Sequence, residues 1–219
     1  MITYEDIRKS SEIHDYIEAG NRVLGVLGYT DHGFAHATKV AETAAAILRD
    51  LGFGEREQEL AKIAGYLHDI GNMVNRHDHA QTGAILAFRL LDHIGLPAGE
   101  LAMVVGAIGN HDENTGMPVS AVSAALILAD KSDVRRTRVR NRQKITFDIH
   151  DRVNYAVEEA DLSIGEARDV VRLRLKIDTD ISPVMDYFEI FLSRMLMCRR
   201  AAEYLGLLFQ LIINGNTLL

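Results

Sequence analysis

The sequence predicts a mainly α-helical protein in which a helical bundle is followed by a small C-terminal module with the element order ββαβ. Up to about residue 145, apolar side chains recur every three to four positions, as they do on the buried face of a helix. Residues 170–177 alternate apolar and basic side chains instead, which is typical of a half-buried strand. We therefore expect a helical domain over residues 1–145 and a module over residues 146–219 that packs against it.

Six helices are expected in the first domain from apolar spacing, from glycines that end helices and from side chains that cap them. Gly20 and Gly25 are candidate breaks in the first helix, while Asp78 and Ser120 can cap the fourth and the sixth. The three prolines, at positions 97, 118 and 183, leave long stretches free to be helical. The expected helices are 4–28, 34–51, 55–69, 79–94, 98–110 and 121–139.

In the C-terminal module, strands are expected over 152–164 and 170–177, joined as a hairpin around Gly165. A helix is expected over about 183–205, followed by an apolar strand over 207–214. Such a sheet has an exposed edge, and an uncovered edge favours pairing with a second copy of the chain. The sequence therefore predicts a homodimer formed through this module.

The composition excludes several classes of protein. Hydrophobic residues make up 47% of the 219 positions, which is enough for a sizeable core, and the formal net charge of −7 argues against a dedicated nucleic-acid binder. Because Cys198 is the only cysteine, neither an intrachain disulfide nor a cysteine metal cluster is expected. The charged first residues do not resemble a signal peptide, and apolar runs stay shorter than a membrane span. We expect a soluble, cytoplasmic protein without a membrane partner.

Histidine and aspartate residues stand where the helical pattern expects apolar side chains. Asp130 lies near the apolar face of its helix, where a carboxylate needs a cation, yet Lys131 and Arg135 are expected to point elsewhere or only partly toward it. Helical bundles build metal sites from such side chains on separate helices. Imidazole and carboxylate groups without thiolate suit manganese, iron, zinc, cobalt or nickel. The candidate residues are His36, His68, Asp69, His79, His111 and Asp130.

The order of these residues resembles the motif of the HD-domain superfamily of metal-dependent phosphohydrolases, and the extra histidines resemble its dinuclear branch, H…HD…H…H…D. The resemblance covers about residues 30–135 and includes the segments HGFAH, LHDIGN, HAQTGA and LILADKSD. It implies an HD-type helical bundle for the first domain. The residues that match the core motif are His36, His68, Asp69 and Asp130.

The resemblance also implies a site for one or two divalent transition-metal ions. One ion would be bound by the four residues of the core motif and the second by His79 and His111, with Asp69 as a bridge between them. The segment RHDHA also offers His77 as a ligand, but the glycine at position 83 favours His79, because relatives show the same four-residue spacing.

The implied chemistry is attack on phosphorus by a hydroxide shared between two cations. Asp69 as the bridge and Asp130 as a hydrogen-bonding partner of the hydroxide are the expected catalytic carboxylates. His32 precedes His36 by four residues and would lie one turn away if the helix extended that far. From there it could bind substrate phosphate or protonate a leaving group; the alternative is a residue that faces water.

Phosphate binding needs a cation that the motif itself lacks here. Many relatives carry lysine directly after HDIG, where this chain has Asn72. The segment 131–144 is strongly basic, and its charges suit the negative end of a helix. Within it, Arg135 and Lys131 are the candidates for contact with substrate phosphate. The expected partner is a small phosphorylated molecule, in particular a nucleotide.

Three functions are compatible with this pattern. The first is hydrolysis of a phosphate ester or anhydride of a nucleotide or a related small metabolite. The second is a mixed-valence di-iron oxygenase of HD-like fold, which uses the same ligand set. The third is a non-catalytic domain that binds or senses nucleotides. The basic segment and the HDIGN context favour phosphate chemistry, and the complete ligand set argues against a non-catalytic domain.

Overall fold

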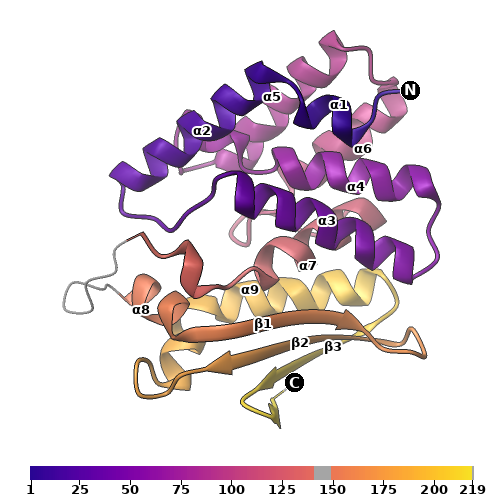
Figure 1. The fold of residues 1–219 in the computed structure, drawn as a ribbon. Coiled ribbons are helices and arrows are strands. Elements are labelled where there is room, and N and C mark those ends of the chain that lie inside the picture. Colours follow the sequence, from indigo (N-terminus) through magenta and orange to yellow (C-terminus); the bar gives the residue numbers. More distant parts are fainter. Residues whose placement is uncertain (141–148, 219) are drawn as a thin grey trace.

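The first part of the chain forms a helical bundle, as the sequence predicts (Figure 1). The computed structural model describes residues 1–140 and 149–218. Most helix boundaries lie within two residues of those expected from spacing and capping. The elements of the bundle are α1 (Tyr4–Arg8), α2 (Ser11–Val26), α3 (Phe34–Asp50), α4 (Glu55–Leu67), the 3₁₀ turn η1 (Ile70–Met73), α5 (His79–His93), α6 (Ala98–Gly109), α7 (Ala121–Ser132) and the 3₁₀ turn η2 (Arg136–Arg138).

The helix expected over residues 4–28 is divided, but at neither of the glycines considered as breaks. The chain leaves the helix after Arg8, and α2 starts anew with Ser10 as its cap, whose hydroxyl accepts the backbone N–H of Ile13 at 3.4 Å. Gly20 and Gly25 both lie inside α2. A capping side chain therefore decides this boundary, whereas glycine inside a packed helix is tolerated.

Helix α7 is shorter than predicted. Ser120 caps it as expected, since its hydroxyl accepts the N–H of Ser123 at 3.0 Å. The expected end at residue 139 is wrong, because Asp133 leaves the helical conformation and α7 ends at Ser132. Of the basic segment 131–144, the part beyond residue 140 lies outside the described residues, as does the predicted domain boundary after residue 145.

The C-terminal part begins with a helix where a strand was expected. In the segment 152–164, only the second half is extended, and the first half belongs to α8 (Ile149–Ala156). Val153 and Ala156 are both buried, which is the three-residue spacing of a helix face. The elements that follow are β1 (Val157–Ile164), β2 (Val170–Ile177), α9 (Val184–Tyr204), β3 (Leu208–Ile213) and the unexpected short β4 (Asn216–Thr217).

The strands form one sheet in the order β1-β2-β3-β4. Strands β1 and β2 make the predicted antiparallel hairpin, and β3 pairs in parallel with β2 after the crossover through α9. Leu173 and Leu175 of β2 are buried, while Arg174 and Lys176 between them are exposed. The alternation in the sequence therefore correctly predicts which side chains of this strand are buried and which are exposed.

Helix α9 lies between the sheet and the bundle, and one hydrophobic core runs through all three (Figure 1). Met195 and Met197 belong to this core, whereas Met185 in the first turn of α9 is 73% exposed. Within residues 1–140 and 149–218, no helix is both long and apolar enough to cross a membrane. The division into two domains, the homodimer and the cytoplasmic location stay predictions.

Candidate metal centre

Two helices that carry ligand candidates pack with their backbones in close contact. A side chain at Gly65 of α4 would place its Cβ 2.7 Å from the Cα of Ala41 in α3, so only glycine fits there. This approach brings His36, in the first turn of α3, next to His68, which directly follows α4. Both imidazoles are buried, with 0% and 1% of their surface exposed.

Four side chains meet around one point in the bundle. His36 Nε2 lies 3.3 Å from His68 Nε2, 3.6 Å from Asp69 Oδ2 and 3.4 Å from Asp130 Oδ1. His68 Nε2 lies 3.2 Å from Asp69 Oδ2 and 3.6 Å from Asp130 Oδ1. Ligand atoms that surround one zinc-sized ion tetrahedrally are about 3.4 Å apart. The separations of the His36, His68 and Asp130 atoms therefore suit a common divalent cation, and Asp69 Oδ2 lies beside both histidines.

The other carboxylate oxygen of Asp69 faces a second pair of histidines. His79 Nε2 lies 3.1 Å from His111 Nε2 and 3.5 Å from Asp69 Oδ1, and His111 Nε2 lies 3.9 Å from the same oxygen. His79 begins α5 and His111 follows the end of α6. Of the two alternatives in RHDHA, His79 is the buried one, whereas the side chain of His77 is 85% exposed.

In all four histidines the second ring nitrogen contacts an oxygen acceptor. His36 Nδ1 lies 2.7 Å from Asp133 Oδ2, and the other three histidines bond the carbonyl three residues before them, at 2.6–3.1 Å. Because a carboxylate or carbonyl oxygen only accepts, each Nδ1 carries a proton, which leaves Nε2 as the ring nitrogen that can bind a metal. At His79 and His111 the two Nε2 atoms face each other at 3.1 Å, an arrangement that a bound cation would stabilise.

The charges at the centre also call for a cation. Burial would raise the carboxyl pKa of both Asp69 and Asp130. The nearby His68 nevertheless holds the pKa of Asp69 well below its usual value, and Lys131 together with His36 does the same for Asp130. Burial lowers the pKa of His68, but the two aspartates outweigh it and raise that pKa to about 10. Burial keeps the pKa of His79 and His111 below the usual value, so both stay in the neutral, metal-binding form.

The cation that Asp130 requires is Lys131, contrary to the expectation that this side chain points elsewhere. Lys131 Nζ lies 2.9 Å from Asp130 Oδ2 and 2.6 Å from Glu113 Oε2. Glu113 Oε1 in turn accepts a hydrogen bond from Arg194 Nε of α9 at 2.9 Å. The C-terminal module therefore contributes a charged residue to the surroundings of the site, which sequence reasoning missed because 63 positions separate Arg194 from Lys131.

Arg135, the other predicted phosphate ligand, is also bound to a carboxylate. Its Nε lies 2.6 Å from Asp133 Oδ1, and its guanidinium also donates to Asp133 Oδ2 at 3.0 Å. Asp133 is fully buried behind His36 and was not among the residues selected from the sequence. Its position three residues after Asp130, within the helix expected from the sequence, was the available signal. The contact of Lys131 and Arg135 with substrate phosphate stays a prediction.

His32 lies beside the centre but not on α3, which begins at Phe34. Its ring centroid is 5.3 Å from that of His36, and its Nδ1 donates to the Thr30 carbonyl at 2.7 Å, so the neutral ring presents Nε2 as an acceptor. Burial and the nearby charge of Arg138 hold the pKa of His32 well below its usual value.

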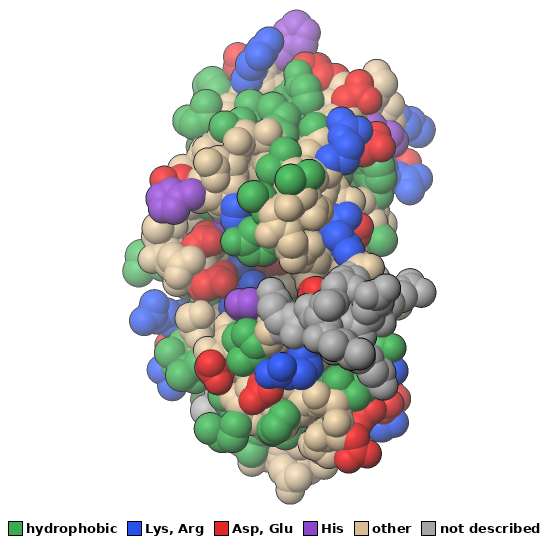
Figure 2. Space-filling model, turned by 90° about the vertical axis from the view of Figure 1, so that its left-hand side faces the viewer, with side chains coloured by type: hydrophobic (Ala, Val, Ile, Leu, Met, Phe, Trp, Pro, Cys, Tyr) green, Lys and Arg blue, Asp and Glu red, His purple; other side chains and the backbone are tan. Residues whose placement is uncertain are grey.

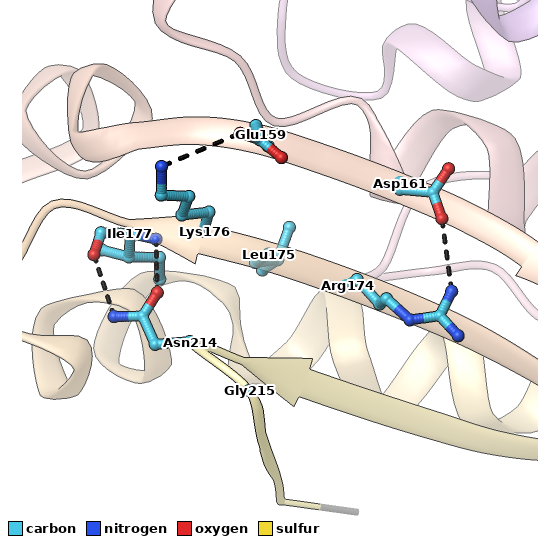
Figure 3. A pocket seen from close by; sticks show the side chains of 8 residues that line it. All are labelled: Glu159, Asp161, Arg174, Leu175, Lys176, Ile177, Asn214 and Gly215. Carbon is cyan, nitrogen blue, oxygen red and sulfur yellow. Dashed lines mark hydrogen bonds and ion pairs between the residues drawn. The ribbon is translucent and has the colours of Figure 1, made fainter.

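Two cavities open next to the centre, in a face where acidic, basic and histidine side chains surround a hollow (Figure 2). One, of ≈ 620 Å³, is lined by Asp112, Glu113 and Asp78, and the other, of ≈ 260 Å³, by His32, Arg138 and residues of α8 and α9. A third cavity lies on the exposed face of the sheet, where Glu159 and Asp161 pair with the basic residues of β2 (Figure 3). Its lining holds none of the histidines of the centre.

Fold and site together define a helical bundle with an interior histidine–aspartate centre suited to divalent cations. The family model described as HD domain matches residues 33–155, more than half of the 219-residue chain, and the chain belongs to this family. Membership supports phosphohydrolase chemistry in general. The predicted superfamily and helical fold are thereby confirmed.

Relatives of the chain include one of similar extent and two much longer proteins. The uncharacterized protein MJ1020 of Methanocaldococcus jannaschii is 27% identical over 190 residues, which cover 76% of this chain and 73% of that protein. Proteins named Ribonuclease Y from Campylobacter curvus and Opitutus terrae are 32% and 30% identical over 52% and 54% of this chain, and the matches span only 22% of their own length. A crystal structure of a predicted HD superfamily hydrolase from an uncultured Thermotogales bacterium is 28% identical, with a TM-score of 0.45, over 57% of this chain and 67% of that chain.

Proposed function

We propose that the protein is a metal-dependent phosphohydrolase that cleaves a phosphate ester or anhydride of a nucleotide or a related small metabolite. One observation carries the proposal. Four buried histidines and two partly buried aspartates gather inside the bundle, and each histidine Nδ1 contacts an oxygen acceptor, which leaves Nε2 as the nitrogen that can bind a metal. Such an arrangement is costly in a core unless it binds cations.

The residues at the centre have distinct parts in this proposal. The core motif residues would hold one divalent ion of manganese, iron, cobalt, nickel or zinc, and His79 with His111 and Asp69 Oδ1 would hold a second. When bound, such ions polarise a phosphoryl oxygen and lower the pKa of water. Asp130, fixed through Oδ2 by Lys131, directs Oδ1 into the centre. The neutral ring of His32 can accept a hydrogen bond at Nε2 from a water or hydroxyl group in the adjoining cavity.

The substrate class follows from charge and size. Of the two cavities beside the centre, the one of ≈ 620 Å³ has a volume typical of small-molecule sites, and the one of ≈ 260 Å³ is slightly smaller than that range. The formal net charge of −7 disfavours a long nucleic acid, whose binding requires a basic surface. The two relatives named Ribonuclease Y support a phosphodiester as an alternative bond type, so short RNA belongs among the compounds to be tested.

The proposal is tested by metal analysis of protein purified without chelator, together with a hydrolysis screen in the presence of manganese, cobalt, nickel and magnesium. The screen should contain nucleoside mono-, di- and triphosphates, general phosphatase substrates and a short RNA. Asp69→Ala and His68→Ala remove ligands of the centre. Asp161→Asn, on the exposed face of the sheet, is the matched control because it changes an aspartate distant from the centre.

We expect metal in the wild type and in the Asp161→Asn control, and its loss together with activity in both ligand variants. Equal metal content in wild type and Asp69→Ala would refute the assignment of the centre. Phosphate release that is unaffected by His68→Ala would refute the mechanism. Oxygen consumption by the iron-loaded protein without phosphate release would support the oxygenase instead.

A further inference from the structure

The cations around the metal centre differ in how far their donors are already used. Lys131 and Arg194 both bind Glu113, and Arg135 binds Asp133. Arg138 donates through Nε to the Asp31 carbonyl at 2.9 Å and through Nη1 to the Asp133 carbonyl at 2.7 Å, and its side chain is only 7% exposed. These side chains organise the walls of the site, and their main donors are bound to protein oxygens.

Arg76 is the cation with a different setting. It follows η1 in the loop before α5, and its Nη1 lies 3.3 Å from Asn72 Oδ1, 3.3 Å from His79 Nε2 and 3.9 Å from Asp69 Oδ1. Asn72 is itself buried and donates from its side-chain amide to Asp69 Oδ1 at 2.8 Å. Asn72 therefore links the guanidinium of Arg76 to the carboxylate shared by both halves of the centre.

The guanidinium is also placed for contact with a ligand. It lies over the ring of Tyr29 at 5.4 Å, an arrangement that restrains the side chain without using its hydrogen-bond donors. Its side chain is 21% exposed and lines both cavities beside the centre. With respect to residues 1–140 and 149–218, its hydrogen bonds and ion pairs all use Nη1, so Nε and Nη2 are available to an anion.

We propose that Arg76 is the residue that binds the substrate's phosphoryl group, with Asn72 and Tyr29 holding its guanidinium in place. An arginine can donate two parallel hydrogen bonds to phosphate oxygens, which gives orientation as well as charge. Arg76 thereby takes the role that the sequence suggested for Arg135. This inference rests on the proposed phosphohydrolase function, and it predicts a preference for substrates whose phosphoryl group keeps two free oxygens.

The test measures binding of inorganic phosphate by titration calorimetry, with and without Mn²⁺, to wild type and to the variants Arg76→Ala and Arg76→Lys. Arg22→Ala is the matched control, since Arg22 is an exposed residue of α2 that pairs with Glu18. Loss of charge-assisted hydrogen bonds should weaken phosphate binding about tenfold or more in Arg76→Ala. Arg76→Lys should recover part of this loss because it keeps the charge but not the paired donors.

Mn²⁺ affinity separates this inference from the function on which it rests. We expect Arg76→Ala to bind Mn²⁺ no more weakly than the wild type, because the contact of Arg76 Nη1 with His79 Nε2 is removed. Wild-type phosphate affinity in Arg76→Ala would overturn the inference. If Mn²⁺ binding were tighter at the same time, Arg76 would be a competitor of the metal and not a phosphate ligand. Absence of Mn²⁺ binding in the wild type would instead overturn the proposed function, while phosphate titration of the metal-free proteins would still test Arg76.

Discussion

Asp133 should control the metal affinity of the centre without touching the metal. Its Oδ2 lies 2.7 Å from His36 Nδ1, and both side chains are fully buried. A buried hydrogen bond to a charged group contributes about 1.5–3 kcal/mol. If Asp133→Ala removes this contribution to the orientation of His36, the dissociation constant for Mn²⁺ should rise by about 10–100-fold.

The measurement is calorimetric titration of Mn²⁺ into metal-free protein, for Asp133→Ala, Asp133→Asn and the wild type. Asp133→Asn keeps an oxygen acceptor but removes the charge, so its loss of affinity should be smaller. Imidazole nitrogen NMR should show that His36 loses its single Nδ1-protonated form in Asp133→Ala. The control is Asp161→Asn, in which an exposed aspartate of β1 is changed in the same way.

Asp133 also faces Lys39, Arg135 and Arg138, so its removal should lower the melting temperature as well. Affinity must therefore be measured at a temperature where circular dichroism shows the variant to be folded. Wild-type Mn²⁺ affinity in folded Asp133→Ala would refute the reasoning, whatever the change in melting temperature, because His36 would then not depend on this acceptor.

Three further predictions concern stability and reactivity. Gly65→Ala places Cβ 2.7 Å from the Ala41 backbone and should cost about 2 kcal/mol of unfolding free energy, whereas Gly99→Ala, where nothing lies within 4 Å, should be neutral; equal melting temperatures would contradict this. Burial raises the pKa of Cys198 to about 12, so the folded protein should not react with iodoacetamide at pH 8, and rapid alkylation would contradict it. Burial would raise the pKa of Glu113, but two adjacent cations hold it below its usual value. Glu113→Gln should therefore lower the unfolding free energy by about 2 kcal/mol at pH 7 and by progressively less below about pH 4. A difference in unfolding free energy that stays constant down to pH 3 would contradict this.

Local patterns made much of the bundle predictable. Helix ends follow capping residues and glycines near in sequence, and β2 shows its two faces as alternating side chains. The first half of 152–164 was harder, because its apolar spacing fits a poor strand as well as a short helix. The break between α1 and α2 was missed because Ser10 was not recognised as a cap.

At the site, ligand candidates could be selected from the sequence, but their supporting contacts could not. The ammonium group of Lys131 is buried and contacts both Asp130 and Glu113. Glu113 reaches it from the loop that follows α6, so this contact depends on how that loop packs against α7. Arg194 joins them from the C-terminal helix α9, which presents this residue only when packed on the bundle. Long-range packing of this kind leaves no spacing rule in the sequence.

The four histidines show why one of these supporting contacts had to be long-range. His68, His79 and His111 stand at helix ends, and each bonds the carbonyl three residues earlier; the carbonyl of Ile108 also accepts the backbone N–H of His111. His36 instead lies inside the first turn of α3, where the carbonyl three residues earlier, that of Gly33, accepts the N–H of Ala37. Its Nδ1 proton bonds an acceptor from another element, Asp133 at the end of α7. Three of the four partners are thus found three residues away in the sequence, whereas the partner of His36 lies 97 residues away.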